Sequence, residues 1–427
     1  MEDVWITLIV LFGFMFFGMP VAFAVAAAAI LGIIFSGLPA IVVAQRMLAG
    51  VDSYAMLAVP LFLLMGEIMS TAGLTIRLVN FMNHLVGRFT GGLGAVNVSV
   101  NMVMGGMSGS ALSDVAMSGS ALIPAMVSSG YSRGYAAAIT ATSSIMGPII
   151  PPSIPFIVYG SVFSVSIGQL FLAGVIPGLL IGVLLLITNW VYTRTYRIGG
   201  QIPSSRAQIW DAFTGALPTL LTPILILGGI FGGFFTPTEA AAVGVLYALM
   251  LGAFVHRSLT FRQLVEALAQ TASTSAVLFF IIAASSAYGW YLARSDVGRL
   301  IVDLFSPIKS EPLLVLLFLN LVFLLFGSFM ETWAIFFLLV PLVMPLVREI
   351  GIDPVQFGII LVINLNIGLV TPPFGMCMFI SNRIAQATIG EFTRALLVFM
   401  PALLVVLALA TYIPALSLWL PHTLFAN

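Results

Sequence analysis

Two short polar segments interrupt an otherwise apolar chain, and their residue types suit the binding of a small ion or solute. Residues 105–114 (GGMSGSALSD) carry three serines, the flexible Gly109 and the carboxylate of Asp114. Residues 143–153 (SSIMGPIIPPS) contain three prolines, which cannot continue helical hydrogen bonding and so leave backbone carbonyls unpaired. Hydroxyl and carbonyl oxygens suit a small hard cation, while helix N-termini at the same place donate N–H groups to an anion. We therefore predict a site for sodium together with a carboxylate-bearing solute.

The second half of the chain repeats this pattern in residues 327–332 (GSFMET) and 364–373 (NLNIGLVTPP). Six helix-breaking residues recur 221 positions later, in the pairs Gly106/Gly327, Pro124/Pro345, Gly130/Gly351, Gly147/Gly368, Pro151/Pro372 and Pro152/Pro373. Such a fixed period indicates two structural repeats. Irregular backbone of this kind is costly in lipid, so both pairs of segments must be buried in protein or line a wet cavity.

Composition identifies the elements that must position these segments. Of 427 residues, 61% are hydrophobic and 7% are charged, against roughly a quarter charged in soluble proteins. Apolar runs such as residues 175–191 and 313–326 approach the ~20 residues of a membrane-spanning helix. The chain is thus predicted to be an all-α polytopic membrane protein. A net charge of zero gives no indication of nucleic-acid binding, and the single Cys377 excludes an intramolecular disulfide.

Charge patterning predicts the orientation. Residues 75–89 form an amphipathic segment with Arg77 and Arg88 on its polar face, as expected of an interfacial arm helix. Its counterpart covers residues 297–309. The positive-inside bias places the first arm in the cytoplasm, together with a basic linker containing Arg194, Arg197 and Arg206.

A consistent path through the membrane follows from a cytoplasmic N-terminus. The predicted elements are one retained helix kinked at Gly18 and Pro20 (4–35), a helix (56–71), a re-entrant hairpin with its tip near 108–110 (92–125), a helix broken at 148–152 (131–165), helices 167–191, 218–235, 238–255 and 271–288, a second hairpin (313–347), a helix broken at 369–373 (356–383), and a last helix (396–420) with a periplasmic C-terminus. The two arms then lie on opposite faces, so the repeats are inverted, as in many secondary transporters.

These elements group into successive regions of scaffold and transport elements. The predicted regions are residues 1–90 (scaffold and first arm), 91–166 (first hairpin and broken helix), 167–217 (scaffold helix and linker), 218–311 (scaffold and second arm), 312–388 (second hairpin and broken helix) and 389–427 (C-terminal helix).

Charged residues inside the membrane are functional candidates by default. Asp114 can ligate a cation, relay a proton or cap the second helix of its hairpin, and Glu331 lies at the equivalent of Ser110. Four further charged residues are predicted to snorkel from helix ends to the headgroups: Arg46, Asp52, Glu67 and Asp296.

Two other classes of membrane protein are disfavoured by the sequence. Residues 106–109 fit the G-x-S-G spacing of an intramembrane serine protease, but that chemistry needs a base beside Ser108. The three histidines lie in interfacial or terminal segments: His84, His256 and His422. A channel would have continuous pore helices and no need of mirrored hairpins.

Four motifs together resemble the large membrane subunit of tripartite ATP-independent periplasmic (TRAP) transporters. They are GGMSGSALSDVAMSGSALIPAM (105–126), GPIIPPSIPFIVYG (147–160), GSFMETWAIFFLLVPLVMPL (327–346) and NIGLVTPPFGMCMF (366–379). The likeness extends to PVAFAVAAAAI (20–30) and FTPTEAAAVG (235–244) and covers nearly the whole chain.

This resemblance implies a bacterial inner-membrane protein that imports an organic acid with a sodium gradient by an elevator-like movement. It also implies two partners, a small four-helix membrane subunit and a soluble periplasmic binding protein. Carried over to this sequence, one sodium site comprises Ser108, Ser110, Ser144 and Gly147, and the other comprises Gly327, Ser328, Thr332, Gly368 and Thr371. Glu331 stands where the family often has Asp.

Substrate contacts are expected at Ser108, Ser110, Asp114, Pro151, Glu331, Asn366 and Pro372. Sialic acid, C4-dicarboxylates, other sugar acids and ectoine-like solutes are all compatible with such a site. An alternative with the same architecture is a self-sufficient dicarboxylate carrier, coupled to sodium or protons, that needs no binding protein.

Overall fold

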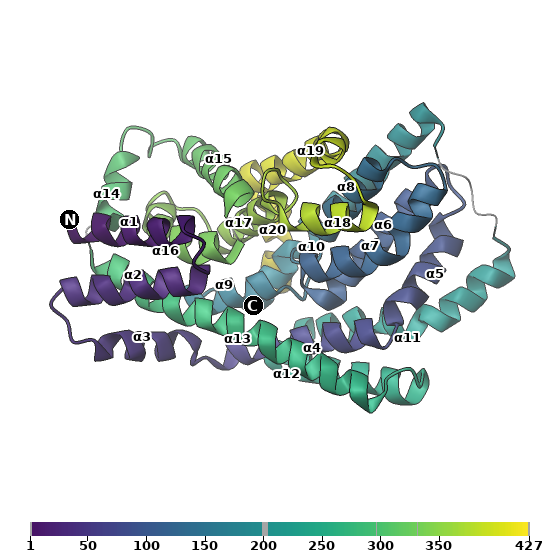
Figure 1. The fold of residues 1–427 in the computed structure, drawn as a ribbon, viewed down its shortest axis with the longest axis horizontal. Helices are drawn as coiled ribbons and strands as arrows, with labels where there is room; N and C mark the ends of the chain where they lie inside the picture. Colours follow the sequence, from purple (N-terminus) through teal and green to yellow (C-terminus); the bar gives the residue numbers. More distant parts are fainter. Residues whose placement is uncertain (1, 199–203, 296, 331, 426–427) are drawn as a thin grey trace.

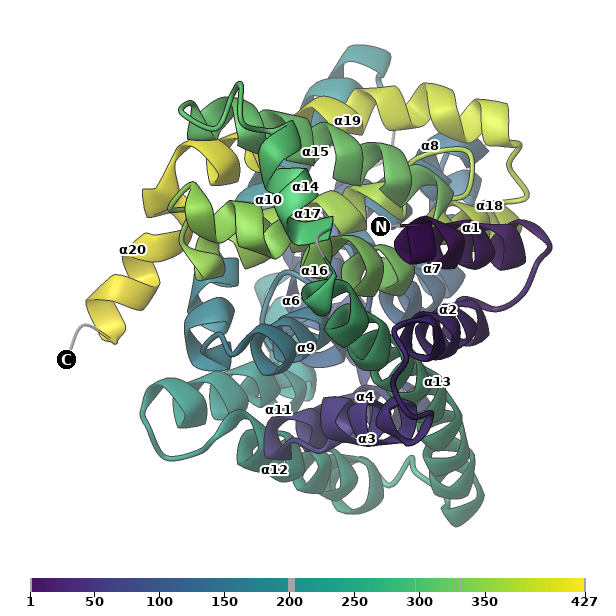
Figure 2. The same cartoon turned by 90° about the vertical axis from the view of Figure 1, so that its left-hand side faces the viewer.

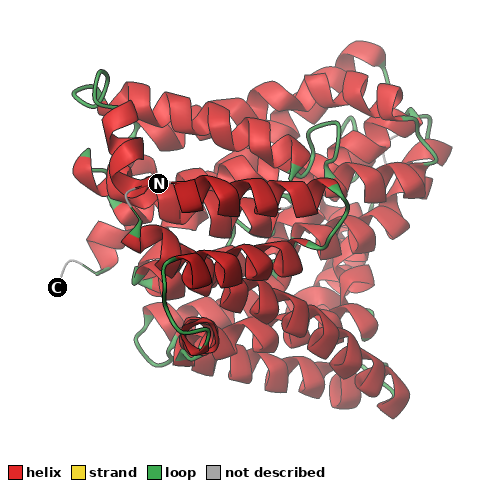
Figure 3. Ribbon diagram, turned by 60° about the vertical axis from the view of Figure 1, so that its left-hand side comes forward, coloured by secondary structure: helices red, strands yellow, loops and turns green. Residues whose placement is uncertain are grey.

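The computed structural model describes residues 2–198, 204–295, 297–330 and 332–425, and these form helices joined by loops, with no strand among them (Figure 3). Eight helices in this part of the chain are long and apolar enough to cross a membrane. The predicted all-α polytopic architecture is therefore confirmed.

The first half contains α1 (Glu2–Phe16), α2 (Val21–Phe35), α3 (Ile41–Val51), the short 3-10 helix Tyr54–Leu57, α4 (Ala58–Thr71), α5 (Leu74–Val86), α6 (Gly92–Ser108), α7 (Ala111–Ser128), α8 (Arg133–Ser144), α9 (Ile154–Phe163) and α10 (Ile167–Tyr196). The second half contains α11 (Arg206–Phe231), α12 (Pro237–Met250) with a π-helical end (Leu251–Val255), α13 (Phe261–Arg294), α14 (Val297–Leu304), α15 (Pro312–Phe329), α16 (Thr332–Glu349), α17 (Pro354–Gly368), α18 (Met376–Ala385), α19 (Ile389–Tyr412) and α20 (Pro414–Leu424). We call α6–α7 hairpin 1 and α15–α16 hairpin 2.

All four predicted interruptions occur where the sequence places them. Hairpin 1 reverses at Gly109, which adopts φ +60°, a conformation that glycine reaches without steric cost. Hairpin 2 reverses between Phe329 and Thr332. The breaks fall between α8 and α9 and between α17 and α18, and each contains a cis Pro–Pro peptide bond.

The predicted single kinked helix over residues 4–35 is wrong. α1 and α2 are separate helices that pack side by side (Figure 1). The chain reverses at Gly18, whose φ of +83° ends α1, and Pro20 immediately precedes α2. Gly233, with φ +72°, makes the equivalent turn between α11 and α12. The repeated proline, Pro20 and Pro237, therefore marks the start of a new helix in both halves.

Three further predicted helices differ from the structure in their bounds. The last helix, predicted over 396–420, is divided into α19 and α20 at Ile413 and Pro414. Helices α11 and α13 begin well before the predicted residues 218 and 271, because capping boxes at Ser205 and Thr260 satisfy their first backbone N–H groups. Their extra turns are polar, so an apolar search underestimates their length.

The long helix α13 organises the scaffold by packing against α2, α3, α4 and α16. α3 and α4 lie one after the other along α13 and run antiparallel to it. Arg46 of α3 stacks on Trp290 near the end of α13. The Ser258 hydroxyl, just before α13 begins, donates to the Ala72 carbonyl, just after α4 ends (2.7 Å). Figure 2 shows α3, α4, α11 and α12 on one side of the molecule and α15 and α19 on the other.

The N-terminus and α5 lie at opposite ends of α13. Val4 shares a buried cluster with Tyr291 and Leu292 near the end of α13, whereas Ala72, next to α5, meets Ser258 near its start. A helix of 34 residues is about 51 Å long. The predicted path has the N-terminus and the first arm on the same side, and it is wrong here because the α1–α2 reversal adds one crossing.

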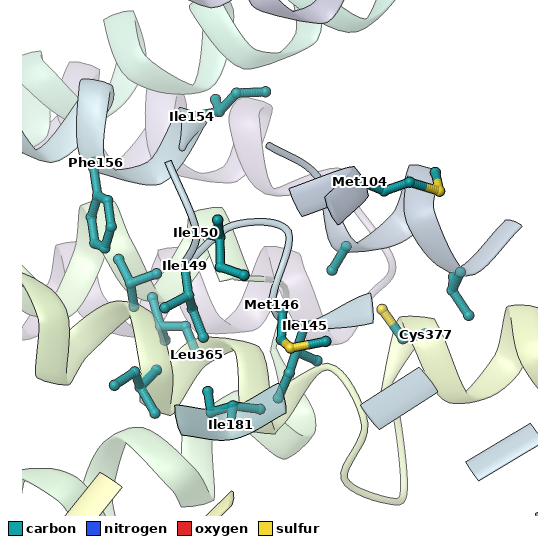
Figure 4. Close-up of a cluster of buried hydrophobic side chains, with 14 of the residues drawn as sticks. Met104, Ile145, Met146, Ile149, Ile150, Ile154, Phe156, Ile181, Leu365 and Cys377 are labelled. Atoms are coloured by element: carbon teal, nitrogen blue, oxygen red, sulfur yellow. The ribbon is translucent and has the colours of Figure 1, made fainter. Parts of the chain in front are cut away.

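The break between α8 and α9 is fixed by the hydrophobic core. Ile145, Met146 and Ile149 are fully buried, and Figure 4 shows this segment beside Ile181 of α10 and Leu365 of α17. The irregular backbone is thus enclosed by protein, as its unpaired groups require.

Candidate substrate and ion site

Both hairpin tips and both helix breaks meet at one cavity of about 140 Å³, which we call the central pocket. Hairpin 1 contributes Gly109, Ser110, Ala111 and Leu112; hairpin 2 contributes Thr332 and Trp333; the broken helices contribute Pro148, Ile154, Pro155, Asn366, Leu369 and Met376; the scaffold contributes Leu63, Thr274 and Leu278. The pocket therefore joins the two repeats to the scaffold.

Two of the predicted substrate residues, Ser110 and Asn366, line this pocket, together with Thr332, which was predicted as a sodium ligand. Asn366 is buried, its amide donates to the Val362 carbonyl (2.7 Å), and its Oδ1 has no hydrogen-bond partner among the described residues. An unpaired buried acceptor of this kind indicates that a ligand or water completes the site.

Four helix N-termini border the central pocket. Its lining includes the first residues of α7 (Ala111), α9 (Ile154), α16 (Thr332) and α18 (Met376). No charged side chain is among its described lining residues. Backbone N–H groups and helix dipoles are thus the positive features of the pocket, and they favour an anion.

Ser110, and not Asp114, caps the second helix of hairpin 1. The Ser110 hydroxyl accepts a long hydrogen bond from the Ser113 N–H (3.5 Å), while the Ser108 hydroxyl accepts from the Ser110 N–H (3.3 Å). Asp114 is the residue after Ser113 and lies inside α7, past the capping position. The capping alternative for Asp114 is therefore excluded by the geometry.

Asp114 is the one charged residue among the fully buried side chains of the described chain. Neither carboxylate oxygen makes a hydrogen bond of normal geometry there, although the Ser108 hydroxyl faces the carboxylate. Oδ2 points at Gly147 in the first break so closely that a Cβ on that residue would collide with it. Ser144 is adjacent in sequence to this break, and its hydroxyl donates to the Ala141 carbonyl (2.8 Å). A buried carboxylate without a partner requires a cation or a proton.

Each hairpin tip contacts its break through glycine. A Cβ on Gly105 would lie 3.3 Å from Cα of Gly147, and one on Gly327 would lie 3.3 Å from Cα of Gly368. The two repeats thus make a similar contact, shifted by one residue, since Gly106 and not Gly105 is the repeat equivalent of Gly327. Of these four glycines, the sequence assigned Gly147, Gly327 and Gly368 to the sodium sites.

Hairpin 2 is also hydrogen-bonded to its break, since the Phe374 N–H donates to the Ser328 carbonyl (3.1 Å). The hydroxyls of Ser328 and Thr371 donate to carbonyls of their own helices, Leu325 and Ile367 (both 2.7 Å). Their lone pairs remain available to a cation.

The remaining predicted residues are not brought to the pocket. Pro151 is buried in the first break and Pro372 lies in the second, and neither is part of the lining; Pro148 takes the expected place of Pro151. Glu331 lies outside the described residues. The sequence analysis missed Trp333 and the scaffold residues Leu63, Thr274 and Leu278, for which it offered no signal beyond apolar helix.

Asparagines connect each hairpin to its broken helix. In the first repeat, Asn101 donates to the Ser143 hydroxyl (2.8 Å) and Asn97 to the Thr140 hydroxyl (2.7 Å). In the second, Asn364 donates to Asn320 Oδ1 (2.8 Å). Ser143 and Asn364 are equivalent in the repeat, so both halves use this position to hold hairpin and break together.

A wider cavity of about 500 Å³, which we call the vestibule, opens from the central pocket on the α5 side. It shares Leu63, Ser110, Leu112 and Thr274 with the pocket and adds Ser108, Glu67 and polar residues of α4, α7 and α13. Glu67 thus lines a cavity, in contrast to the predicted snorkelling. A third cavity of about 350 Å³ lies between α3, α9, α13 and α16 and shares no lining residue with the pocket.

The sequence profile of a family described as "Tripartite ATP-independent periplasmic transporter, DctM component" matches residues 8–416. The chain is 41% identical to the sialic acid TRAP transporter large permease protein SiaM of Vibrio cholerae, over 96% of each chain. It is 38% identical to the C4-dicarboxylate TRAP transporter large permease protein DctM of Pseudomonas aeruginosa, over 87% of each. It is 36% identical to the 2,3-diketo-L-gulonate TRAP transporter large permease protein YiaN of Escherichia coli, over 88% of each.

Proposed function

The chain belongs to the family of DctM components of tripartite ATP-independent periplasmic transporters, a family of transporters and not of enzymes, and we propose that it imports a small organic acid across the bacterial inner membrane, driven by a sodium gradient. The relatives named above carry sialic acid, C4-dicarboxylate and 2,3-diketo-L-gulonate in their names. All three are carboxylates, so a carboxylate-bearing solute is the substrate class that we propose for this chain.

The observation that carries this substrate class is the convergence of four helix N-termini on the central pocket. They offer N–H donors to a carboxylate without a fixed cationic side chain. Ser110, Thr332 and Asn366 supply neutral hydrogen-bonding groups for the rest of the solute.

Sodium is the proposed coupling ion, and it is a transported substrate. The unpartnered carboxylate of Asp114 supports a cation beside Gly147, with carbonyls of the first break and the hydroxyls of Ser108, Ser110 and Ser144 nearby in the chain. The equivalent glycine contact in the second repeat supports a second ion, held by Gly327, Ser328, Thr332, Gly368 and Thr371. A bound cation beside each pocket wall would strengthen the binding of an anion between them.

The cavities support alternating access. The pocket is continuous with the vestibule at the α5 end and separate from the third cavity at the α14 end. We infer that the hairpins and broken helices move against α4 and α13 as an elevator, which would connect the pocket to the other side.

The distribution of basic residues supports the orientation. Ten of the fifteen lysines and arginines lie at the α5 end: Arg77, Arg88, Arg133, Arg194, Arg197, Arg206, Arg257, Arg262, Arg383 and Arg394. Contacts hold these segments together, including Tyr135 donating to Asn189 (3.0 Å) and Arg133 to the Gln386 carbonyl (3.4 Å). We propose that this end is cytoplasmic, so that both termini are periplasmic.

The partners that we propose are a small four-helix membrane subunit and a periplasmic binding protein that delivers the solute. Reconstitution of the chain in liposomes, with and without candidate partners, tests this. We expect uptake of radiolabelled sialic acid, succinate or 2,3-diketo-L-gulonate that needs the binding protein and an inward sodium gradient. Uptake by the chain alone would favour a self-sufficient carrier, and uptake that follows a proton gradient instead would refute sodium coupling.

A further inference from the structure

The vestibule contains one carboxylate that the transport site does not use. Glu67 lies in the last third of α4, one turn before the helix ends at Thr71, and is half-buried. It is the only charged residue among the described lining of the vestibule. An ionisable residue of a membrane-spanning helix that faces a cavity points to a role in an ion or substrate pathway.

The facing wall of the vestibule supplies neutral oxygens. Gln270 and Thr271 of α13 line it, as does Ser113 of hairpin 1. Thr271 is 8% exposed, and its hydroxyl has no hydrogen-bond partner among the described residues. Thr140 and Thr193 donate to the carbonyl four residues earlier (both 2.7 Å), whereas Thr271, like Thr219 and Thr222 of α11, makes no such bond among the described residues. Unlike those two, Thr271 lines the vestibule, so its unpaired oxygen stands at the wall of a polar cavity.

A carboxylate surrounded by hydroxyl and amide oxygens is the ligand set of a hard cation. An anion finds no cationic side chain among the described vestibule residues. We propose that Glu67, with Thr271 and Gln270, forms a third cation site, in the vestibule, which receives sodium as it leaves hairpin 1 for the cytoplasm. The sodium part rests on the proposed function, whereas the cation site itself does not.

The position of the site gives it a separate role from the two sites beside the pocket. Ser108 and Ser110 of hairpin 1 line the vestibule together with Glu67, so an ion released from the hairpin enters this cavity directly. Glu67 and Thr271 belong to the scaffold helices α4 and α13, and the ion therefore passes from the moving elements to the fixed ones. The same negative charge repels the carboxylate of the solute, so the ion and the solute separate in the vestibule.

Chemical modification of an introduced cysteine tests the cation site in an experiment that does not measure transport. Ser70 lines the vestibule beside Glu67, and the native Cys377 is buried. In the full-length Ser70→Cys protein, each reagent's rate is divided by its rate with a free thiol in solution, because a thiolate itself favours cationic reagents. After this correction we expect a cationic methanethiosulfonate reagent to be favoured about fivefold or more over an anionic one, because a nearby unit charge acts strongly in such a cleft. Replacing choline chloride by sodium chloride at constant ionic strength should slow the cationic reagent.

Two variants in the Ser70→Cys background decide the outcome. Glu67→Gln should abolish both the preference for the cationic reagent and the protection by sodium, while Glu67→Asp should keep the preference. Thr271→Val should weaken the protection without loss of folding, since this hydroxyl makes no hydrogen bond among the described residues. Ser161→Cys in the third cavity is the matched control, and Glu67→Gln should leave its reactivity unchanged.

The proposal is overturned if Ser70→Cys shows no charge preference, or if Glu67→Gln leaves the preference and the sodium protection intact. Both results stand whether or not uptake is sodium-coupled, which the reconstitution experiment decides separately. Protection by sodium at Ser70→Cys in a transporter coupled to protons would leave the cation site in place and refute only its role in sodium release.

Discussion

Asp114 carries the clearest charge argument of the molecule, because its carboxylate is buried without a partner. In Asp114→Asn the bound cation loses the attraction of one negative charge. Such an attraction is ~4 kcal/mol at a separation of about 4 Å and an effective dielectric of ~20. The sodium concentration for half-maximal uptake should therefore rise roughly tenfold or more. In sodium-free buffer the buried carboxylate of the wild type must bind a proton, so the neutral amide should change the melting temperature there only slightly and remove its rise with sodium.

Sodium titration of the melting temperature of the purified protein, together with uptake, measures both effects. Asp211→Asn is the control, because Asp211 is exposed on α11. A wild-type sodium response in Asp114→Asn would show that the carboxylate does not face the ion.

Gly368 is the glycine on which hairpin 2 depends most directly. A Cβ there would lie 2.6 Å from the Gly327 backbone carbonyl. Backbone cannot move aside as a flexible side chain does, so Gly368→Ala should destabilise the protein by about 1–3 kcal/mol and abolish uptake. Gly390→Ala in α19 is the matched control, since a Cβ there meets nothing within 4 Å. Its melting temperature in detergent should equal that of the wild type or be slightly higher. Equal melting temperatures for both variants would contradict the predicted collision.

Several of these residues were predictable from sequence, and the reasons differ. Gly147, Gly368, Ser110 and Thr332 were found because helix-breaking and small polar residues recur at one offset in both repeats. Pro151 was wrongly preferred to Pro148, because sequence does not tell which proline of a break points to the cavity.

At the scale of elements, the contact between α13 and hairpin 2 tests the elevator movement. A Cβ on Gly289 would lie 3.7 Å from Cβ of Pro341 in α16, within the 3.5–4.5 Å range of disulfides. The oxidised double variant Gly289→Cys/Pro341→Cys should therefore be locked and lose uptake, and a reductant should restore it.

The matched control joins two scaffold segments at the α5 end. A Cβ on Gly252 would lie 3.1 Å from Cβ of Ala72, so these segments must separate by a few tenths of an ångström to reach the disulfide range. Because both belong to the scaffold, oxidised Gly252→Cys/Ala72→Cys should transport as well as its reduced form. Undiminished uptake by the oxidised Gly289/Pro341 pair would mean that hairpin 2 does not move along α13.

The elements themselves were predictable where local chemistry decides them. Gly109 and the double prolines end helices whatever surrounds them, so the hairpins and breaks were located correctly. The turn at Gly18 and Pro20 is equally compatible with a kink or a reversal, and only the packing of α1 on α2 decides between them. The scaffold lining of the pocket was unpredictable for the same reason, because tertiary packing determines which face of α4 or α13 meets a hairpin.

At the scale of the whole molecule, the reversal at Gly18 places the N-terminus at the end opposite to α5. We expect Asp3→Cys to react with a membrane-impermeant maleimide in intact cells, whereas Arg88→Cys should react only after permeabilisation. The buried Cys377 gives little background. Labelling of Asp3→Cys only after permeabilisation would restore the cytoplasmic N-terminus of the sequence analysis.

The shortness of α1 and α2 has a consequence for the surrounding lipid. Each has 15 residues and so spans only about 22 Å, against ~30 Å for the hydrocarbon layer. Side chains such as Trp5, Phe16 and Phe17 are exposed along this pair. Unless a neighbouring subunit covers it, the bilayer must become thinner by several ångströms here. The protein therefore deforms its membrane on one flank, and short acyl chains or a protein neighbour would be drawn to that flank.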